Sequence, residues 1–392
     1  MRILHTADWH VGRQLAGRSF LADQKRVLTE IAEIARRESV DVVVIAGDLY
    51  DRANPGEDAV QVLGDHLEAI CRIAPVIAIA GNHDSGPRLD FGRGLLRGGR
   101  LHLAGTAFDR PETVCIPDQH GEVSFHLMPY ATPERVRAAR QDPEIRSHAD
   151  ATRARIEAIG DERRDRAILV GHLFVTGGQP TESSERDISV GGVSDVPSAV
   201  FESFQYTALG HLHRPHSLGE GRRLRYAGSP IAYSFGEQGG AKSVSIVDLD
   251  ASGGIEVEEV PLLTAPAVVV RRGAFDELMA SLKAECSTTD PDGVPTLIRV
   301  ELSDRVPIPD AFGKLRSVHP GVIELGFDRL AAGSAVAGQH AAEDLRTRSP
   351  QDFLTRFFDD ARLSESQPDL DGEIRSLGRA LMEEILHDGG EA

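Results

Sequence analysis

The sequence predicts an α/β fold built around a parallel β-sheet. Short apolar runs at residues 3–4, 42–45 and 75–80 are typical of strands buried on both faces. The two longer segments between these runs carry apolar residues at helical spacing. Strands that alternate with helices in this way form βαβ units with right-handed crossovers.

The first helix is predicted over residues 21–38, where Val27, Leu28 and Ile31 share one face. A second amphipathic helix is marked by Val60, Leu63, Leu67, Ile70 and Cys71. The alanine-rich, charged segment 133–160 is also predicted to be helical. Further strands are expected at residues 101–103, 123–127, 167–170, 206–209 and 243–249.

The pattern changes near residue 263, which divides the chain into three predicted domains. The main domain is residues 1–262. Residues 263–340 are predicted to form a small α+β module, with strands at 268–270 and 296–302 around a helix at 275–284. Residues 341–392 are polar except for two amphipathic segments, which predict a helical hairpin that needs a surface to pack on.

Composition indicates a cytoplasmic protein without a membrane segment. The chain has 392 residues and is 41% hydrophobic, yet it lacks an apolar run long enough to cross a membrane and an N-terminal signal peptide. Its three cysteines are far apart, so neither a disulfide framework nor a cysteine zinc site is indicated. The net charge of −18 argues against nucleic-acid binding through a broad basic surface. It does not exclude a nucleic-acid substrate, because bound cations or a partner protein can supply the positive charge.

Metal-ligand residue types follow the predicted strands at the points where the strands end. They are Asp8, His10, Asp48, Asn82, His172, His211 and His213. The carboxyl ends of parallel strands meet at one edge of a sheet, so we expect these side chains to converge. Oxygen and imidazole ligands without a thiolate suit Mn, Fe, Zn or Mg.

The arrangement of these residues suggests hydrolysis of a phosphoester. Asp48 stands at the end of a buried strand, and its two oxygens allow it to bridge two ions. Seven ligands with one bridging carboxylate suffice for two ions about 3.5–4 Å apart, which can clamp a phosphate and activate a water. His83 follows a ligand and precedes Asp84, so we expect it to protonate the departing oxygen as general acid.

Other polar residues near the motifs are expected to have supporting roles. Asp51 is predicted to cap or brace its loop, and Asp84 to hold a histidine or a turn. The glycine-rich segment 176–192 is interpreted as a plain surface loop. The arginines nearest the motif loops are candidates for phosphate contacts; they are Arg13, Arg18, Arg52 and Arg88.

The order of the five motifs resembles the calcineurin-like metallophosphoesterase superfamily, and within it the SbcD family of bacterial nuclease subunits. The narrower resemblance covers about residues 1–260 and rests on residues 5–12, 47–51, 177–192, 210–213, 226–230 and 234–235. It implies a two-sheet α/β/β/α sandwich with a small α+β capping domain and a C-terminal helical hairpin.

The resemblance also implies a ligand set and partners. One Mn²⁺ ion would be held by Asp8, His10, Asp48 and His213, and the other by Asp48, Asn82, His172 and His211, with Mg²⁺ as a substitute. His83 would assist the leaving group. Some relatives carry a second histidine at the position where this chain has Asp51. His83 would therefore be the single obvious catalytic histidine of this chain.

The family resemblance further implies the substrate and the assembly. The substrate would be DNA, cut by a 3′–5′ double-strand exonuclease and a single-strand and hairpin endonuclease activity. Residues 263–340 would shape DNA access, and the C-terminal helices would dock the SbcC ATPase subunit. Two nuclease subunits would form a homodimer within a heterotetramer.

Two other functions are compatible with parts of the sequence. A small-molecule phosphodiesterase, for example one acting on cyclic nucleotides, would not need the extra C-terminal 130 residues or so. A scaffold that holds DNA ends with little catalysis would not need the full ligand set. Substitution of His83 separates a scaffold from a nuclease, because only the nuclease should lose its function.

Overall fold

The computed structural model describes residues 1–96, 98, 100–181, 195–286, 294–304, 306, 308–327 and 376–377. Residues Met1–Phe327 form one compact unit, to which residues 328–392 do not belong. The predicted C-terminal hairpin, the end of the small module and most of the glycine-rich segment lie outside the described residues. Among the described helices, none is long and apolar enough to cross a membrane.

The first large sheet has the order β14-β13-β1-β4-β5-β6. Its strands are β1 (Arg2–Thr6), β4 (Val42–Ile45), β5 (Val76–Ile79), β6 (Leu101–Ala104), β13 (Ser243–Leu249) and β14 (Ile255–Pro261). Strands β1, β4, β5 and β6 are parallel to one another. Strand β13 pairs antiparallel with β1, and β14 pairs antiparallel with β13. Helices α1 (Leu21–Arg37) and α2 (Glu57–Cys71) connect the first three parallel strands, so the predicted βαβαβ unit is confirmed.

The second large sheet has the order β11-β12-β10-β9-β8-β7. Its strands are β7 (Glu112–Asp118), β8 (Gly121–Met128), β9 (Ala167–His172), β10 (Tyr206–Gly210), β11 (His216–Leu218) and β12 (Leu224–Tyr226). Strands β8, β9, β10 and β12 are parallel to one another. Both large sheets therefore bring the carboxyl ends of parallel strands to one edge.

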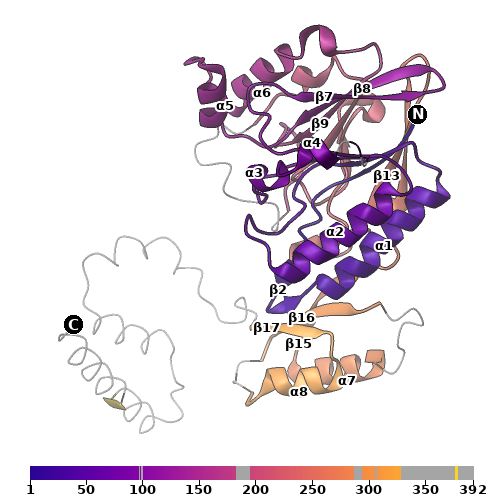
Figure 1. Cartoon of the computed structure of the whole chain (residues 1–392). Coiled ribbons are helices and arrows are strands. Elements are labelled where there is room, and N and C mark those ends of the chain that lie inside the picture. Colours follow the sequence, from indigo (N-terminus) through magenta and orange to yellow (C-terminus); the bar gives the residue numbers. More distant parts are fainter. Residues whose placement is uncertain are drawn as a thin grey trace. The chain divides into compact units, whose positions relative to one another are not determined.

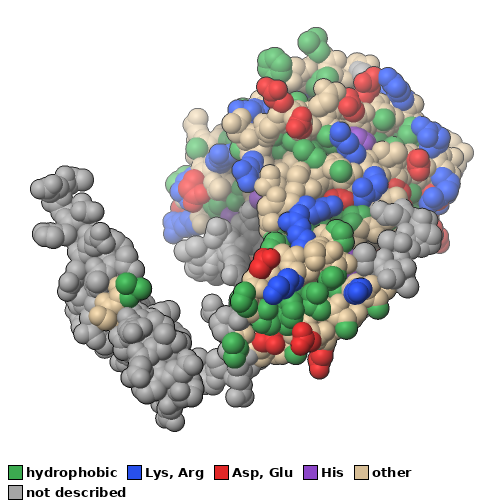
Figure 2. Space-filling model, turned by 90° about the horizontal axis from the view of Figure 1, so that it is seen from below, with side chains coloured by type: hydrophobic (Ala, Val, Ile, Leu, Met, Phe, Trp, Pro, Cys, Tyr) green, Lys and Arg blue, Asp and Glu red, His purple; other side chains and the backbone are tan. Residues whose placement is uncertain are grey.

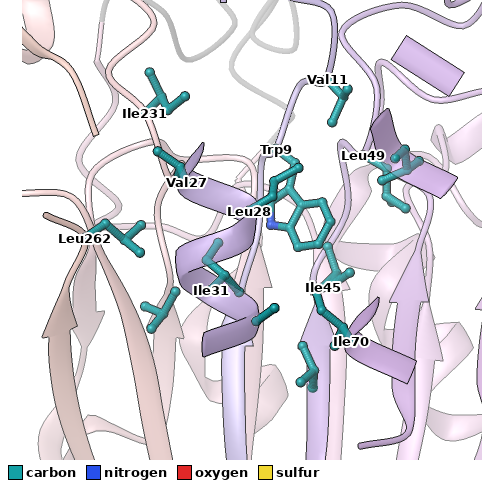
Figure 3. Close-up of a cluster of buried hydrophobic side chains, with 14 of the residues drawn as sticks. Trp9, Val11, Val27, Leu28, Ile31, Ile45, Leu49, Ile70, Ile231 and Leu262 are labelled. Atoms are coloured by element: carbon teal, nitrogen blue, oxygen red, sulfur yellow. The ribbon is translucent and has the colours of Figure 1, made fainter. Parts of the chain in front are cut away.

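Apolar side chains on alternate strand residues separate the layers. In β4, Val43 and Ile45 face α1 and α2, and Figure 3 shows Ile45 near Leu28 of α1 and Ile70 of α2. Val42 and Val44 face the second sheet instead, as part of an apolar layer between the sheets. A third cluster covers the outer face of the second sheet. The result is the predicted α/β/β/α sandwich, seen from the side in Figure 1.

The helical region predicted at residues 133–160 is two helices rather than one. Helix α5 (Pro133–Arg140) ends at Gln141, which has a left-handed φ of 55°. Pro143 follows and disfavours a continued helix. Helix α6 (His148–Glu157) then starts with a capping box between Ser147 and Asp150. The remaining short elements are β2 (Gln14–Leu15), β3 (Arg18–Ser19), α3 (Gly86–Leu89), α4 (Arg93–Leu96), η2 (Gly160–Glu162), η4 (Ser198–Phe201), η5 (Glu220–Arg222) and η6 (Phe235–Glu237).

A three-stranded parallel sheet follows the sandwich. It contains β15 (Ala267–Gly273), β16 (Thr296–Leu302) and β17 (Val322–Phe327), with α7 (Phe275–Cys286) and α8 (Ala311–Val318) as the connections. The helices pack on one face over a core of their own. Val268, Leu297 and Ile323 point the other way, into the cluster around α1. The module is thus packed against the sandwich, below α1 in Figure 1.

The surface of the module in Figure 2 mixes hydrophobic side chains with acidic and basic ones. Hydrophobic side chains gather on the face turned to the viewer, and Asp or Glu side chains border them. This face is not a broad basic surface.

Candidate metal centre

All seven predicted ligands lie at or just beyond strand ends at the shared edge of the two large sheets. Asp8 and His10 follow β1, Asp48 follows β4, and Asn82 follows β5. The second sheet contributes the three remaining histidines, His172, His211 and His213, from the ends of β9 and β10. Six of the seven are at most 3% exposed, and Asn82 is half-buried. The sequence prediction that these residues converge agrees with this geometry.

Four of these residues have an unusual backbone. The φ angles of Asp8, His10, Asp48 and His211 are 54°, 42°, 50° and 102°. Residues other than glycine rarely have a positive φ, and each such conformation costs on the order of 1 kcal/mol or more. Strain of this kind concentrates at functional sites, where the surrounding structure holds a side chain in a required direction. Here it turns side chains toward a common point just beyond the strand ends.

Three glycines allow the motif loops to approach one another. A Cβ atom on Gly81 would lie 2.1 Å from Oδ1 of Asp48, and one on Gly47 would lie 2.3 Å from Nδ1 of His172. A Cβ atom on Gly210 would lie 2.0 Å from the carbonyl oxygen of Ala46. Glycine at positions 47 and 210 is therefore required for close contact between the two sheets at this edge, and glycine at position 81 for close contact between two loops of the first sheet.

One side of the cluster is formed by Asp8, His10 and His213, whose ligand atoms all lie within 4.8 Å of one another. The Nε2 atoms of His10 and His213 face each other at 3.1 Å. Two imidazole nitrogens at this distance must share a proton or a cation. Nδ1 of His10 is buried without a hydrogen-bond partner.

The other side contains Asp48, His172 and Asn82. Nε2 of His172 lies 2.9 Å from Oδ1 of Asn82 and 3.4 Å from Oδ2 of Asp48. That same Asp48 oxygen is 3.5 Å from Nε2 of His10, so the carboxylate stands between the two sides. The ring of His211 lies edge-on to that of His172 at 5.3 Å, and its backbone N–H donates to Asp8.

The charges of the cluster favour a bound cation. Burial raises the pKa of Asp8 to about 6, although His172 and His213 oppose this shift. Burial also raises the pKa of Asp48, but His172 and His10 outweigh it and hold that pKa well below its usual range. Burial lowers the pKa of His172, but Asp48 and Asp8 more than offset it and raise the value to about 9. Burial lowers the pKa of His211 to about 3.

These residues fit a divalent metal. Carboxylates, an amide oxygen and neutral imidazoles are the ligand forms of Mn²⁺, Fe²⁺ and Zn²⁺. The imidazole of His172 is oriented by its Nδ1 atom, which lies 2.9 Å from the carbonyl oxygen of Ala46. A backbone carbonyl can only accept a hydrogen bond, so Nδ1–H donates and Nε2 is directed at the centre.

His83 lies beside the cluster in an orientation suited to proton transfer. Its backbone N–H donates to Oδ1 of Asp48 at 2.9 Å. Its Nδ1–H donates to the carbonyl oxygen of Asp51 at 2.7 Å, which directs Nε2 away from the loop. The His83 ring is 4.5 Å from that of His10. One compact donor group contains His10, Asp48 and His83, so His83 is within reach of a ligand position too.

The acidic neighbours brace the loops. Oδ2 of Asp84 accepts from the backbone N–H groups of Leu49 and Gly81, each at 3.0 Å, and therefore ties two motif loops together. Asp51 accepts from Arg13 at 2.8 Å.

The four candidate phosphate-binding arginines divide into two pairs. Arg13 and Arg18 form ion pairs with Asp51 and Asp23. Arg52 and Arg88 are exposed, although Nε of Arg52 lies 3.5 Å from Asp51.

Sequence patterns missed the buried residues that support the ligands. Gln24 is 1% exposed, and its Nε2 atom donates to the carbonyls of Trp9 and His10 at 3.1 and 2.8 Å. Its Oε1 atom accepts from Gly12. A polar residue on the apolar face of a helix was the available signal, because Gln24 lies on the same face as Val27 and Leu28.

The sandwich and its buried donors define a class of protein, the phosphoesterases that bind divalent metal. Comparison with known proteins assigns the family. The family model described as "Calcineurin-like phosphoesterase" matches residues 1–215, which are more than half of the chain. The chain therefore belongs to the calcineurin-like phosphoesterase family, as the motifs predicted. A second match, to the "Type 5 capsule protein repressor C-terminal domain" (SbcD_C), covers residues 264–362.

A curated relative matches nearly the whole chain. It is the D subunit of the nuclease SbcCD from Staphylococcus epidermidis, 29% identical over 381 residues, which are 94% of this chain and 96% of the relative. The predicted resemblance to the SbcD family is thereby confirmed. Among solved structures, TT1561 of Thermus thermophilus is 13% identical with a TM-score of 0.38 and covers 66% of this chain and 98% of its own. A dimetal phosphatase from Danio rerio is 14% identical with a TM-score of 0.38 and covers 67% and 98%.

Proposed function

We propose that the chain is the nuclease subunit of an SbcCD-type complex and hydrolyses phosphodiester bonds in DNA. The observation that carries the proposal is the Asp48 carboxylate, which lies 3.5 Å from His10 and 3.4 Å from His172 at the junction of the two sheets. The named relative is a nuclease subunit similar over nearly its full length, which supports a nucleic acid as the substrate. DNA end processing, repair and recombination in the cytoplasm would be the cellular role.

The proposed cofactor is a pair of Mn²⁺ ions, with Mg²⁺ as a substitute. Asp8, His10, Asp48 and His213 would hold one ion, and Asp48, Asn82, His172 and His211 the other. Two such ions would supply charge stabilisation for the phosphate and a nucleophile at neutral pH. The compact donor group of Asp8, His10 and His213 supports the first of these ligand sets, and Asp48 lies with His10 in a second group and with His172 in a third, as a bridging position requires.

The chain's own residues complete the proposed mechanism. Asp48 holds the backbone of His83 through its Oδ1 atom, so the same carboxylate places the ligands and the acid. His83 is positioned by the Asp51 carbonyl and would deliver a proton from Nε2 to the departing oxygen. Asp84 fixes the distance between the loops that carry Asp48 and Asn82.

The assembly is proposed from the domain pattern. Residues 1–262 would be the nuclease domain, residues 263–340 the capping domain that shapes DNA access, and residues 341–392 the segment that docks the SbcC ATPase. A homodimer of nuclease subunits is also proposed. Exposed apolar side chains on α2 and around α4 support it, since Phe91 and Leu95 are 86% and 87% exposed and Val60 is 47% exposed.

The proposal is tested by cleavage of end-labelled duplex, single-stranded and hairpin DNA. The purified chain is assayed with Mn²⁺, Mg²⁺ or a chelator. We expect Mn²⁺-dependent cleavage with release of nucleotides from 3′ ends. Parallel assays with bis-p-nitrophenyl phosphate and a cyclic nucleotide test the small-molecule alternative. Turnover of those esters, with DNA left intact both alone and with SbcC and ATP, would contradict the proposal.

The docking role is tested by deletion of residues 345–392. We expect the shortened chain to lose binding to SbcC and to keep basal cleavage of small esters, because the described donors all lie before residue 214. Co-purification with SbcC provides the measurement. Undiminished binding of the shortened chain to SbcC would contradict the docking role.

A further inference from the structure

A buried ion pair stands directly behind one of the candidate ligands. Glu237, in η6, is 4% exposed, and Lys242 is 7% exposed. Nζ of Lys242 donates to Oε2 of Glu237 in a short contact. The other Glu237 oxygen, Oε1, lies 3.6 Å from Nδ1 of His213. His213 in turn directs Nε2 at His10 across the cluster.

The same pair holds the backbone of this ligand. Nζ of Lys242 donates to the carbonyl oxygen of His213 at 3.0 Å and to Oγ of Ser229 at 2.9 Å. The backbone N–H of Ser229 donates to the same His213 carbonyl at 3.1 Å. One ammonium group therefore ties together the main chain of His213, the segment that begins at Ser229, and the carboxylate of Glu237.

The carboxylate is held from a second direction as well. Oε1 of Glu237 accepts from the backbone N–H of Tyr233 at 2.9 Å. The Tyr233 ring lies 5.4 Å from that of His10 and 5.9 Å from that of His213. Its hydroxyl donates to the carbonyl oxygen of Trp9, next to His10. Residues 229–242 thus form a support behind His10 and His213.

A role in packing alone does not account for this arrangement. Burying a charged pair costs several kcal/mol per ion in desolvation, and apolar residues of similar volume often give equal or better stability. A carboxylate behind a metal-binding imidazole has a chemical use instead. It fixes the tautomer with the proton on Nδ1, orients the ring and makes Nε2 a stronger ligand.

We propose that Glu237 and Lys242 are positioning residues that hold His213 as a ligand for the cation on the His10 side of the centre. This inference deepens the proposed function and rests on the metal centre described there. His172, by contrast, is oriented by the neutral carbonyl oxygen of Ala46. The two sides of the centre therefore differ, and loss of the carboxylate should weaken the His213 side only.

The test is a titration of the full chain with Mn²⁺. Isothermal calorimetry and electron paramagnetic resonance measure the binding. Binding is measured without DNA, so the result is independent of whether the substrate is DNA. In Glu237→Gln we expect one of two binding steps to weaken about 10- to 100-fold and the other to stay unchanged. Two steps of unaltered affinity would overturn the proposal.

Glu237→Gln leaves the buried Lys242 charge without its carboxylate, and this can prevent folding. The double variant Glu237→Gln/Lys242→Met removes both charges and keeps similar volumes. We expect it to fold and to show the same selective weakening. If it binds both Mn²⁺ ions as the wild type does, the pair serves only packing and the proposal fails.

Asp118→Asn is the matched control. It removes the carboxylate of a comparably buried ion pair, with Arg166 at 2.6 Å, in β7 and outside the donor cluster. We expect this variant to lose stability while both Mn²⁺ affinities stay unchanged. Selective weakening in Asp118→Asn equal to that in Glu237→Gln would show a general effect of buried ion-pair loss and would overturn the proposal.

Discussion

The two large sheets contribute different chemistry to the candidate metal centre. The first sheet supplies every oxygen donor, from Asp8, Asp48 and Asn82, together with one imidazole. The second sheet supplies imidazoles only, from His172, His211 and His213. A complete ligand set therefore exists only where the sheets meet. Residues from either sheet alone do not bring carboxylates and enough imidazoles together.

The difference extends along the interface between the sheets. Away from the strand ends the layer is mainly apolar, and its cluster includes Val42, Ile77 and Val170. At the strand ends, a left-handed backbone and close-contact glycines replace the regular alternation. Packing in the apolar layer fixes the distance between the sheets. The loops at the strand ends then place the ligands within reach of one another.

Loss of Asp48 should have the largest effect, because its carboxylate stands between both sides. In Asp48→Asn we expect cleavage to fall by about 10⁴-fold or more, equal to about 5.5 kcal/mol of transition-state stabilisation. Metal content after dialysis, measured by plasma mass spectrometry, should fall with it. Two Mn²⁺ ions per chain retained in this variant would contradict the bridging position.

Loss of His83 should separate chemistry from metal binding. In His83→Ala we expect cleavage to fall between about 10²- and 10⁴-fold, which is the usual contribution of a general acid. Metal content should stay at the wild-type level. His120→Ala, at an exposed histidine in the turn between β7 and β8, serves as control and should be active. Loss of metal in His83→Ala would instead make His83 a ligand, as its place in one donor group allows.

Metal removal should weaken the contact between the sheets. A ligand present at about 1,000 times its dissociation constant stabilises the folded state by about 4 kcal/mol. We expect excess Mn²⁺ to raise the melting temperature of the chelated wild type by several degrees in calorimetry. The same addition should have little effect on Asp48→Asn. Equal Mn²⁺ stabilisation of both proteins would place the stabilising ion elsewhere.

A smaller effect is expected at one of the polar contacts between the sheets that lie outside the ligand set. Nδ1 of His5 in β1 lies 2.8 Å from the hydroxyl of Tyr206 in β10. Burial lowers the pKa of His5 to about 3. The unfolded chain binds a proton at this residue near pH 6.5, whereas the folded chain does so only near pH 3. His5 therefore supports stability above about pH 6.5 and progressively less as the pH falls toward about 3.

The pH dependence of stability should therefore differ between the wild type and His5→Gln. From about pH 7.5 to about pH 5.5, His5 should account for about 1.4 kcal/mol of lost stability. His5→Gln keeps a hydrogen-bonding side chain and removes the titration. Denaturant unfolding of the chelated proteins should show a shallower loss in His5→Gln. Parallel losses in both proteins would contradict the buried neutral state of His5.

Much of this site could be predicted from the sequence, because its residues follow recognisable strands. An apolar run, a turn and a polar residue type are local patterns, and they located both Asp48 and His172. The supporting residues are of another kind. Glu237 and Lys242 reach His213 from more than 20 residues away in the chain, and only the folded structure shows that contact.

Prediction of the fold from the sequence also succeeded only where the pattern was local and clear. Strands with continuous apolar runs, such as β4, were predicted correctly. Strand β14 was missed because its residues alternate between glutamates and aliphatics at the edge of the sheet. The break between α5 and α6 had a local signal in Pro143, but the alanine-rich composition of the whole segment outweighed it in the prediction.

Donors from two sheets converge at one edge, and we propose that they hold a pair of bridged ions. Electron paramagnetic resonance of the wild type loaded with Mn²⁺ tests this most directly. Two Mn²⁺ ions about 3.5–4 Å apart should give an exchange-coupled spectrum at a ratio of two ions per chain. The six-line spectrum of an isolated ion at one ion per chain, with no coupled signal at saturation, would contradict a pair of bridged ions.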